Sequence, residues 1–229
     1  MEKKVLAIRH VKVEDLGIFE EILKNQNFSI KYLDTPEGET LKEPVESYQL
    51  VFVLGGYMGA YEEEKYPFLK YEFKLMENAL KKDIPLVGIC LGAQMLAKVL
   101  GAKVYSGEKG KEMGWMKVFK TGEHFYFEEF PEELTVLQWH GDTFDLPEGA
   151  VRVFSSEKYE NQAFVYKNAI GLQFHLEVDD EIVKKWIEYY EDELKKESID
   201  LERFFKVEKK KIELLKKISE KLIKKLVKN

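Results

Sequence analysis

The chain has very few of the residues that build disulfides or metal sites. Only one of its 229 residues is cysteine, and only four are histidine. A single cysteine cannot form an internal disulfide, which fits a reducing compartment and predicts a cytoplasmic protein. The histidines are scattered without metal-ligand spacing, so we expect no metal. No Gly-x-x-x-x-Gly-Lys phosphate loop occurs, so neither ATP nor another cofactor is predicted.

Long apolar runs and an excess of positive charge are missing too. No run of about 18 apolar residues occurs, so we expect no transmembrane helix and no membrane partner. The first residues lead straight into an apolar run, without the pattern of a signal peptide. A net charge of −6 offers no broad basic surface, so nucleic acid is not expected as a partner. The remaining composition, 45% hydrophobic and 34% charged, is ample for one core.

Short apolar runs alternate with helical spacing in the first hundred residues. Strands are predicted at 4–8, 28–33, 50–54 and 84–89, and helices at 15–23 and 68–80. This alternation predicts an α/β fold with a mostly parallel open sheet, flavodoxin-like, and helices on both faces. Such sheets bind ligands at the carboxyl ends of their strands. His10, Gly55–Gly56 and Cys90 fall at strand ends, so we expect them at one crevice.

The second half of the chain has a different pattern. Short strands are predicted at 116–119, 134–139, 151–155, 163–166 and 169–174, which we interpret as a small antiparallel section. From residue 181 the chain is helical, with one apolar stripe formed by Ile182, Trp186 and Tyr189 or Tyr190. A second stripe consists of Ile212, Leu215, Ile218, Leu222 and Leu226. We therefore predict a domain at 1–198 and a C-terminal helical extension at 199–229, packed on the domain or on a second chain.

The stretch 85–94 carries a chemical signal. A buried strand turns sharply at Cys90 and enters a helix at Leu91. Gly88 and Gly92 flank the cysteine in a Gly-x-Cys-x-Gly pattern, which is the nucleophile-elbow spacing with sulfur in place of oxygen. The first amides of a helix lack intrahelical partners, so they favour a thiolate and can hold an oxyanion. The alternative is a buried structural cysteine in a strand-to-helix turn.

A histidine and a glutamate further along complete a catalytic pattern. His175 and Glu177 follow a short apolar run that begins at Ala169. Residues two apart on a strand point to one face, so the carboxylate can orient the imidazole for acyl transfer. The order Cys, His, Glu differs from that of α/β-hydrolases, where the acid precedes the histidine. The alternative is a strand end with two polar residues in solvent.

Four segments together resemble a class I (triad-type) glutamine amidotransferase. They are 54–56, 88–94, 139–142 and 173–177, within a resemblance that spans about 5–178. The likeness is greatest to the glutaminase domain of GMP synthase and its free-standing relatives. It implies that L-glutamine is the substrate and that its side-chain amide is hydrolysed through a Cys90 thioester. In that family the ammonia passes to a synthase, and the 229 residues leave no room for one after the triad, so the resemblance implies either a separate acceptor synthase or a free-standing hydrolase.

The same resemblance implies roles for further residues. One oxyanion amide belongs to the neighbourhood of Gly56 and the second to Leu91. The residues implied to bind the substrate are Gln94, His140, Gly141 and Asp142. By this resemblance Asp142 would pair with the substrate ammonium. Without the resemblance, Asp142 would be interpreted as a turn residue and Gln94 as a solvent-facing helix residue. The family often has proline where this chain has Tyr57, so the loop has more backbone freedom here.

Two other functions stay open. A γ-glutamyl peptide hydrolase would use the same triad, and only the shape of the pocket would separate it from a glutaminase. A non-catalytic regulatory subunit would carry an idle triad, against which the intact Cys90, His175 and Glu177 argue. No role is assigned to His124, which lies in a polar turn. The sequence leaves the oligomeric state open, a homo-oligomer included.

Overall fold

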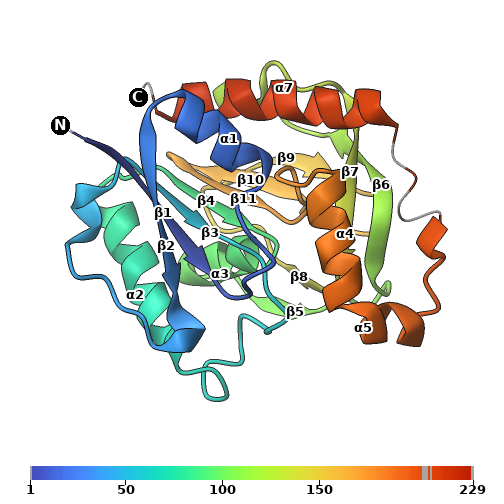
Figure 1. Cartoon of the computed structure of the whole chain (residues 1–229), viewed down its shortest axis with the longest axis horizontal. Coiled ribbons are helices and arrows are strands. Elements are labelled where there is room, and N and C mark those ends of the chain that lie inside the picture. The colour runs from blue at the N-terminus through green and yellow to red at the C-terminus, as the bar shows by residue number, and fades with distance from the viewer. Residues whose placement is uncertain (1, 203–205, 207, 228–229) are drawn as a thin grey trace.

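A nine-stranded sheet forms the centre of the molecule, with helices on both faces (Figure 1). The computed structural model describes residues 2–202, 206 and 208–227. The parallel strands are β1 (Lys3–Arg9), β2 (Phe28–Asp34), β3 (Leu50–Val53), β4 (Leu86–Ile89) and β11 (Ala169–Leu172). The antiparallel strands are β6 (Glu112–Lys120), β7 (Glu133–His140), β9 (Val151–Ser155) and β10 (Ala163–Tyr166). Their order is β2-β1-β3-β4-β11-β10-β9-β6-β7, which confirms the predicted α/β open sheet.

One strand differs from its predicted place. The run from residue 169 was expected in the antiparallel section, but β11 pairs parallel with β4, with Gly171 beside Gly88. On its other side β11 pairs antiparallel with β10, so it joins the two halves of the sheet. All four residues of β11 are buried, as is usual for strands covered on both faces. β5 (Val104–Ser106) and β8 (Asp142–Phe144), neither of them predicted, form a separate antiparallel pair.

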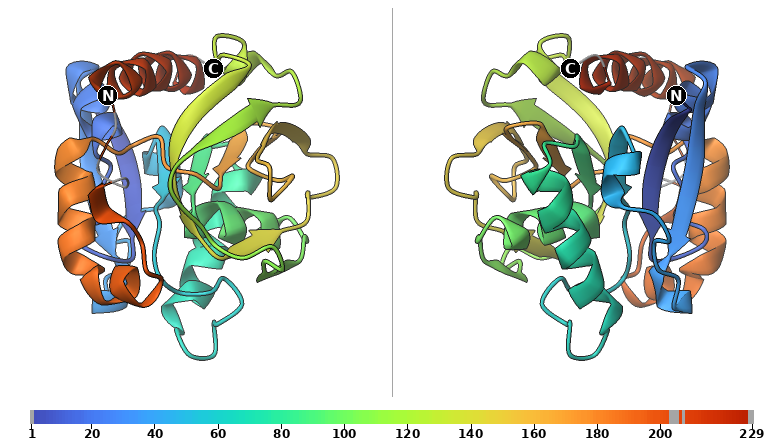
Figure 2. Two further views of the ribbon diagram at one scale, coloured as in Figure 1. Left: turned by 90° about the vertical axis from the view of Figure 1, so that its right-hand side faces the viewer. Right: turned by 90° about the vertical axis from the view of Figure 1, so that its left-hand side faces the viewer.

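The helices divide between the two faces of the sheet. They are α1 (Ile18–Asn25), α2 (Phe68–Lys81), α3 (Leu91–Val99), α4 (Asp180–Tyr189), α5 (Glu191–Lys196) and α7 (Lys209–Leu226). Side chains alternate along β1: Val5 belongs to the core under α1 and α7, and Leu6 to the core under α2 and α3. Figure 2 shows α7 (dark red) and α2 (teal) on opposite sides of the strands. None of the helices in the described ranges combines the length and apolar character needed to cross a bilayer.

The C-terminal helix α7 packs on the α1 face of the sheet. Its buried side chains include Leu215, Ile218, Leu222 and Leu226, which belong to the predicted stripe, and they share one hydrophobic cluster with α1 and the strands. The expectation that this stripe packs on the domain is therefore confirmed. The division into 1–198 and 199–229 stays a prediction. In the other predicted stripe, on α4, Ile182 and Trp186 are buried while Tyr189 is 56% exposed, so the half-buried Tyr190, directly after the helix, completes that stripe.

Candidate active site

A cavity of about 330 Å³ opens at the carboxyl ends of the parallel strands. Most of the predicted site residues line it, namely Gly56, Cys90, Gln94, His140, Gly141, Asp142 and His175. The two others lie directly behind this lining, since Leu91 follows Cys90 in the chain and Glu177 is bonded to His175. The strand ends of an open sheet thus bring together segments that are far apart in the sequence.

The turn at Cys90 requires glycine on both sides. Cys90 has φ 51° and ψ −108°, a conformation that side-chain-bearing residues rarely adopt, between the end of β4 and the start of α3. A Cβ on Gly88 would lie 2.3 Å from the carbonyl oxygen of Gly92. A Cβ on Gly92 would lie 1.9 Å from the carbonyl oxygen of Val53. Backbone therefore packs directly on backbone, and this packing fixes the nucleophile elbow.

The imidazole of His175 links the cysteine to the glutamate. His175 Nδ1 lies 2.6 Å from Glu177 Oε1, and both side chains are almost fully buried. The Cys90 sulfur, after Glu177, is the other neighbour that raises the pKa of the His175 imidazole. Since Nδ1 faces Glu177, the nitrogen left for the sulfur is Nε2. Cys90 Sγ further lies 3.6 Å from the carbonyl oxygen of Trp139, a contact that holds the thiol side chain at the cavity wall.

The backbone around His175 is not the strand end that the sequence suggested. β11 ends at Leu172, and His175 forms an isolated antiparallel bridge with Leu137 of β7. The amide of His175 donates to the carbonyl of Leu137 at 2.9 Å. The Trp186 indole packs edge-on against the imidazole, with 4.8 Å between ring centroids. The histidine is therefore held by β7 and α4 rather than by a regular strand of its own.

The start of α1 holds the backbone of Glu177. The amide of Ile18 donates to the carbonyl of Glu177 at 2.8 Å. Gly17 precedes it with φ 46°, and a Cβ there would lie 2.1 Å from the same carbonyl oxygen. This close approach explains why the helix begins at Ile18 and not at the predicted Asp15. The acid that faces His175 is thus fixed through its own main chain.

Electrostatics in the site favour a protonated imidazole. Burial alone would lower the pKa of His175, but the charge of Glu177 and the contact with the Cys90 sulfur outweigh it. The pKa of His175 is therefore raised well above its ordinary value of 6.5. An imidazolium beside a cysteine stabilises the thiolate, which is the nucleophilic form of the side chain. The arrangement can supply both a nucleophile and a proton donor near neutral pH.

The glycine-rich loop after β3 lies between His175 and the start of α3. A Cβ on Gly55 would lie 3.4 Å from His175 Cε1, and a Cβ on Gly56 would lie 3.0 Å from Leu91 Cδ2. The two predicted oxyanion residues, Gly56 and Leu91, are therefore neighbours in space. Leu91 is the first residue of α3, so its amide lacks an intrahelical acceptor. The role of these amides stays a prediction.

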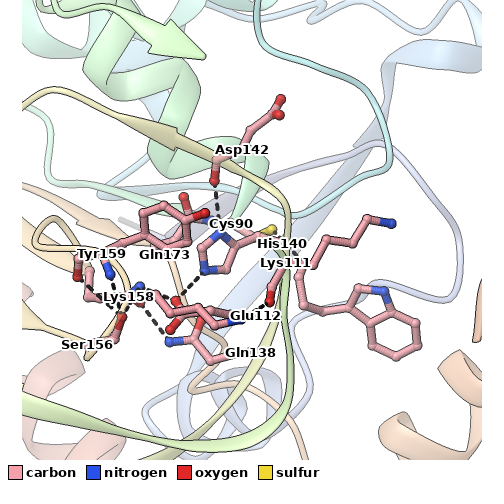
Figure 3. A network of polar contacts seen from close by, with 12 residues as sticks. Cys90, Lys111, Glu112, Gln138, His140, Asp142, Ser156, Lys158, Tyr159 and Gln173 are labelled. Atoms are coloured by element: carbon pink, nitrogen blue, oxygen red, sulfur yellow. Dashed lines mark hydrogen bonds and ion pairs between the residues drawn. The ribbon is translucent and has the colours of Figure 1, made fainter. Parts of the chain in front are cut away.

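His140, which belongs to the predicted substrate-binding segment 139–142, forms hydrogen bonds within the protein through both ring nitrogens (Figure 3). His140 Nδ1 lies 2.8 Å from the carbonyl oxygen of Asp142, and Nε2 lies 3.0 Å from Glu112 Oε2. Gln162 Nε2 donates to the same glutamate oxygen at 2.7 Å. Since both ring nitrogens are engaged within the protein, the ring fixes the shape of the loop. Direct contact of His140 with a substrate stays a prediction.

Gln94 ties α3 to the same loop. Its side chain is buried rather than solvent-facing, and Nε2 donates to Gln173 Oε1 at 3.2 Å and to the carbonyl oxygen of Asp142 at 3.4 Å. Its position in the cavity wall is compatible with the implied substrate contact. Burial and the neighbouring Asp142 side chain raise the pKa of Tyr61, which also lines the cavity.

The structure adds a buried carboxylate that the sequence did not indicate. Glu14 lines the cavity and accepts a hydrogen bond from the hydroxyl of Tyr190. Burial raises the pKa of Glu14, and the Tyr190 hydroxyl and the charges of His175 and His10 offset only part of that rise. No local pattern around residue 14 marks it, because its partners come from α4, β1 and the segment after β11. Only the three-dimensional arrangement identifies this residue.

These features define an α/β protein with an open sheet and a buried site of cysteine, histidine and glutamate. The sequence model of class-I glutamine amidotransferases matches residues 17–187, about three quarters of the chain. The chain belongs to the class I glutamine amidotransferase family.

Related proteins support this membership over most of the chain. The glutamine amidotransferase-like protein YfeJ of Salmonella typhimurium is 28% identical over 83% of this chain and 82% of its own length. GMP synthase of Streptococcus mutans is 35% identical over 56% of this chain, but the match covers only 24% of that enzyme. The crystal structure of a glutamine amidotransferase from Thermotoga maritima is 57% identical over the full length of both chains, with a TM-score of 0.97.

Proposed function

We propose that this protein hydrolyses the side-chain amide of L-glutamine and releases ammonia for a separate acceptor synthase. The observation that carries the proposal is that the buried His175 imidazole is hydrogen-bonded to Glu177 and has its pKa raised by the Cys90 sulfur, and that Cys90 and His175 line the same cavity. The arrangement follows the logic of a nucleophile, a base and a group that orients the base. The match to GMP synthases, which are glutamine-hydrolysing enzymes by name, supports the choice of amide.

The first half-reaction forms a thioester. The Cys90 thiolate attacks the amide carbon, and the carbonyl oxygen becomes an oxyanion held by the amides of Gly56 and Leu91. The His175 imidazolium then gives its proton to the amide nitrogen, which leaves as ammonia. Glu177 keeps the ring oriented and stabilises its charge before the proton moves. The product is a γ-glutamyl thioester on a site whose histidine is now neutral.

The second half-reaction returns the enzyme to its starting state. Neutral His175 takes a proton from water, and the resulting hydroxide attacks the thioester carbon. The tetrahedral intermediate expels the Cys90 thiolate, so glutamate is released and the thiolate–imidazolium pair is restored. Each half-reaction passes through an oxyanion at the same place, so one pair of amides serves both.

The cavity suits a small zwitterion. Its volume of about 330 Å³ lies at the low end of the range for ligand pockets. Asp142 lines it and would attract an ammonium group, whereas Glu193 is paired with Lys111. Asp142 lies on the loop that His140 and Gln94 hold, which supports a role for it in binding the amino-acid end of the substrate while the amide reaches Cys90.

A coupled assay of ammonia release from L-glutamine tests the proposal. Wild type should release ammonia and glutamate in equal amounts, and Cys90→Ala should be inactive. Because Cys90 is the only cysteine in the chain, an electrophilic analogue of glutamine should add once per chain, and glutamine should protect against it. Tyr48→Phe is a suitable control, since it removes a hydrogen bond to Glu43 at the amino ends of the strands. Labelling that glutamine does not slow would contradict a glutamine pocket.

A γ-glutamyl peptide hydrolase is the second candidate, and one observation favours it. Tyr57 and Tyr61 line the cavity yet are 60% and 48% exposed, so its mouth offers aromatic surface to a leaving group larger than ammonia. Glutamine and γ-glutamyl dipeptides should therefore be assayed side by side. A kcat/KM at least tenfold higher for the dipeptides would make the hydrolase the correct function.

A further inference from the structure

The buried His10 contacts the backbone of the glycine-rich loop. It follows β1, and its side chain is shielded from solvent. Nδ1 lies 2.8 Å from the carbonyl oxygen of Gly55, and Nε2 lies 2.9 Å from Glu72 Oε2 on α2. The hydroxyl of Thr35 donates to the other oxygen of Glu72. Three segments far apart in the sequence thus meet at this imidazole. His10 was expected at the crevice, but it is not among the residues that line the cavity.

The partners of His10 determine its protonation. A carbonyl oxygen and a carboxylate oxygen both accept hydrogen bonds, and a neutral imidazole can donate only one. Glu72 Oε2 faces the ring, and Glu72 Oε1 accepts the Thr35 hydroxyl. An imidazolium, which carries a proton on each nitrogen, satisfies both acceptors that face His10. Burial lowers the pKa of His10, but the charge of Glu72, the Gly55 carbonyl and the charge of Glu14 raise it above the ordinary 6.5.

The Gly55 carbonyl and the Gly56 amide belong to one peptide group. A trans peptide is planar, so its C=O and N–H point in opposite directions. No cis peptide occurs among the described residues. With the Gly55 oxygen bonded to His10, the Gly56 N–H points away from His10, and Gly56 is the residue of this pair that lines the cavity. Glycine on both sides of the peptide would otherwise allow it to rotate easily.

We propose that His10 is a positioning residue for the oxyanion hole: its Nδ1–H holds the Gly55–Gly56 peptide with the Gly56 amide directed at the reaction centre. The inference rests on the proposed amide hydrolysis at Cys90. When the ring loses one proton, the charge of Glu72 keeps the remaining proton on Nε2, so the Nδ1 lone pair faces the Gly55 oxygen and the peptide is free to turn. The charged groups that face the ring, Glu72 on α2 and Glu14 in the loop after β1, both favour the proton and so the formed hole.

Two variants in a Glu72→Gln background separate the donor from the charge. In His10→Asn with Glu72→Gln, the asparagine amide reaches about the position of Nδ1 and can donate to the Gly55 oxygen without titrating. In His10→Leu with Glu72→Gln, the leucine side chain has nearly the volume of the histidine that it replaces but no hydrogen-bond donor. The leucine variant should have a kcat about 100-fold lower than the asparagine variant, as for one lost oxyanion donor, with KM within about twofold. Both should alkylate Cys90 with iodoacetamide at the same rate, because His175 and Glu177 are intact.

The pH profile gives a second readout. Wild-type kcat should fall as the pH rises through the pKa of His10, and the asparagine variant should lack that part of the fall. Tyr48→Phe controls for the loss of a buried hydrogen bond remote from the site. Equal kcat values in the leucine and asparagine variants would overturn the proposal.

Crystal structures of the two variants keep this test separate from the proposed function. In the leucine variant the Gly55–Gly56 peptide should be turned, and in the asparagine variant it should keep the wild-type orientation. If wild type hydrolyses no γ-glutamyl amide, the proposed function fails, while the orientation of the peptide still decides whether His10 sets it. An unturned peptide in the leucine variant would contradict the positioning role whatever the activity.

Discussion

His175 Nδ1 lies 2.6 Å from Glu177 Oε1, and this buried pair of histidine and glutamate has two counterparts around the same cavity. The counterparts are His10–Glu72 and His140–Glu112. In His10 and His140, the ring nitrogen that does not face the glutamate contacts a backbone carbonyl oxygen of a loop at the cavity. In His175 the corresponding nitrogen is the one available to Cys90. One chemical pairing therefore serves two purposes: it sets a proton donor beside the nucleophile, and it fixes the loops that surround it.

Glu177→Gln should slow both catalysis and alkylation of the thiol. The neutral amide removes the main charge that raises the pKa of His175, so the ring holds its proton less firmly at neutral pH. The kcat for glutamine should fall by about 10⁴-fold, less than in Cys90→Ala, because a group that orients the base contributes less than the nucleophile. Stopped-flow alkylation by iodoacetamide from pH 5 to 9 measures the thiol directly. Alkylation as fast as in wild type at every pH would contradict the link between Glu177 and the thiol.

Glu177→Gln also tests how the free energy of unfolding depends on pH. The pKa of His175 is higher in the folded state than its unfolded value of about 6.5, so its protonation stabilises the fold. This contribution should be fully present below about pH 6.5 and lost as the pH rises through the folded pKa, well above 6.5. The difference in unfolding free energy between wild type and Glu177→Gln should therefore shrink with rising pH. Urea denaturation at pH 6 and pH 9 checks this, and a difference that grows with pH would contradict it.

Gly92→Ala should destabilise the protein far more than Gly101→Ala. The added methyl group would lie 1.9 Å from the carbonyl oxygen of Val53, where only backbone could move aside. We expect a loss of at least about 3 kcal/mol, or a fall in Tm of roughly 6–12 °C. At Gly101 a Cβ meets nothing within 4 Å, and only its φ of 89° opposes alanine, at about 1–2 kcal/mol. Equal losses of stability would show that the close contact at the elbow is relieved without cost.

Local signals in the sequence predicted the first four parallel strands and the elbow. Apolar runs of strand length mark β1 to β4, and the glycine spacing around Cys90 marks a turn that other residues cannot make. β5 and β8 were missed because each has only three residues, too few for a periodic pattern. The place of β11 depends on its pairing with β4, which lies some 80 residues earlier in the chain and leaves no trace in the local pattern.

The predicted triad residues are brought together, but much of what holds them could not be predicted. Glu72, which pairs with His10, lies in the middle of a helix and looks like any surface glutamate in the sequence. Glu14 is similar, because only its contacts with Tyr190 and the nearby His10 and His175 distinguish it from a surface glutamate. A buried charge is recognisable only when its partner is known, and the partners here are distant in sequence. Motif spacing therefore identifies the reacting groups and misses the groups that position them.

The C-terminal helix should contribute strongly to stability through one face only. Leu222 is fully buried in the cluster that α7 shares with α1, while Leu214 on the same helix is 38% exposed. Leu222→Ala should cost about 2–5 kcal/mol and Leu214→Ala less than about 1 kcal/mol. Thermal denaturation of the pair measures the contrast, with glutaminase activity below the transition as a check that the site is intact. Similar costs for the two leucines would contradict the packing of α7 on the sheet.

Changes at His140 should have the opposite kinetic signature to those at His10. His140 holds the carbonyl of Asp142, whose loop is proposed to bind the amino-acid end of the substrate, an end that does not change during the reaction. Contacts to such a group are equally strong in the ground state and the transition state, so losing them raises KM and leaves kcat almost unchanged. In a Glu112→Gln background, His140→Leu should raise the KM for glutamine about tenfold relative to His140→Asn, which keeps a donor for the Asp142 oxygen. Steady-state kinetics on both pairs of variants decides the matter. A fall in kcat at constant KM would place the Asp142 loop in the stabilisation of the transition state instead of in substrate binding.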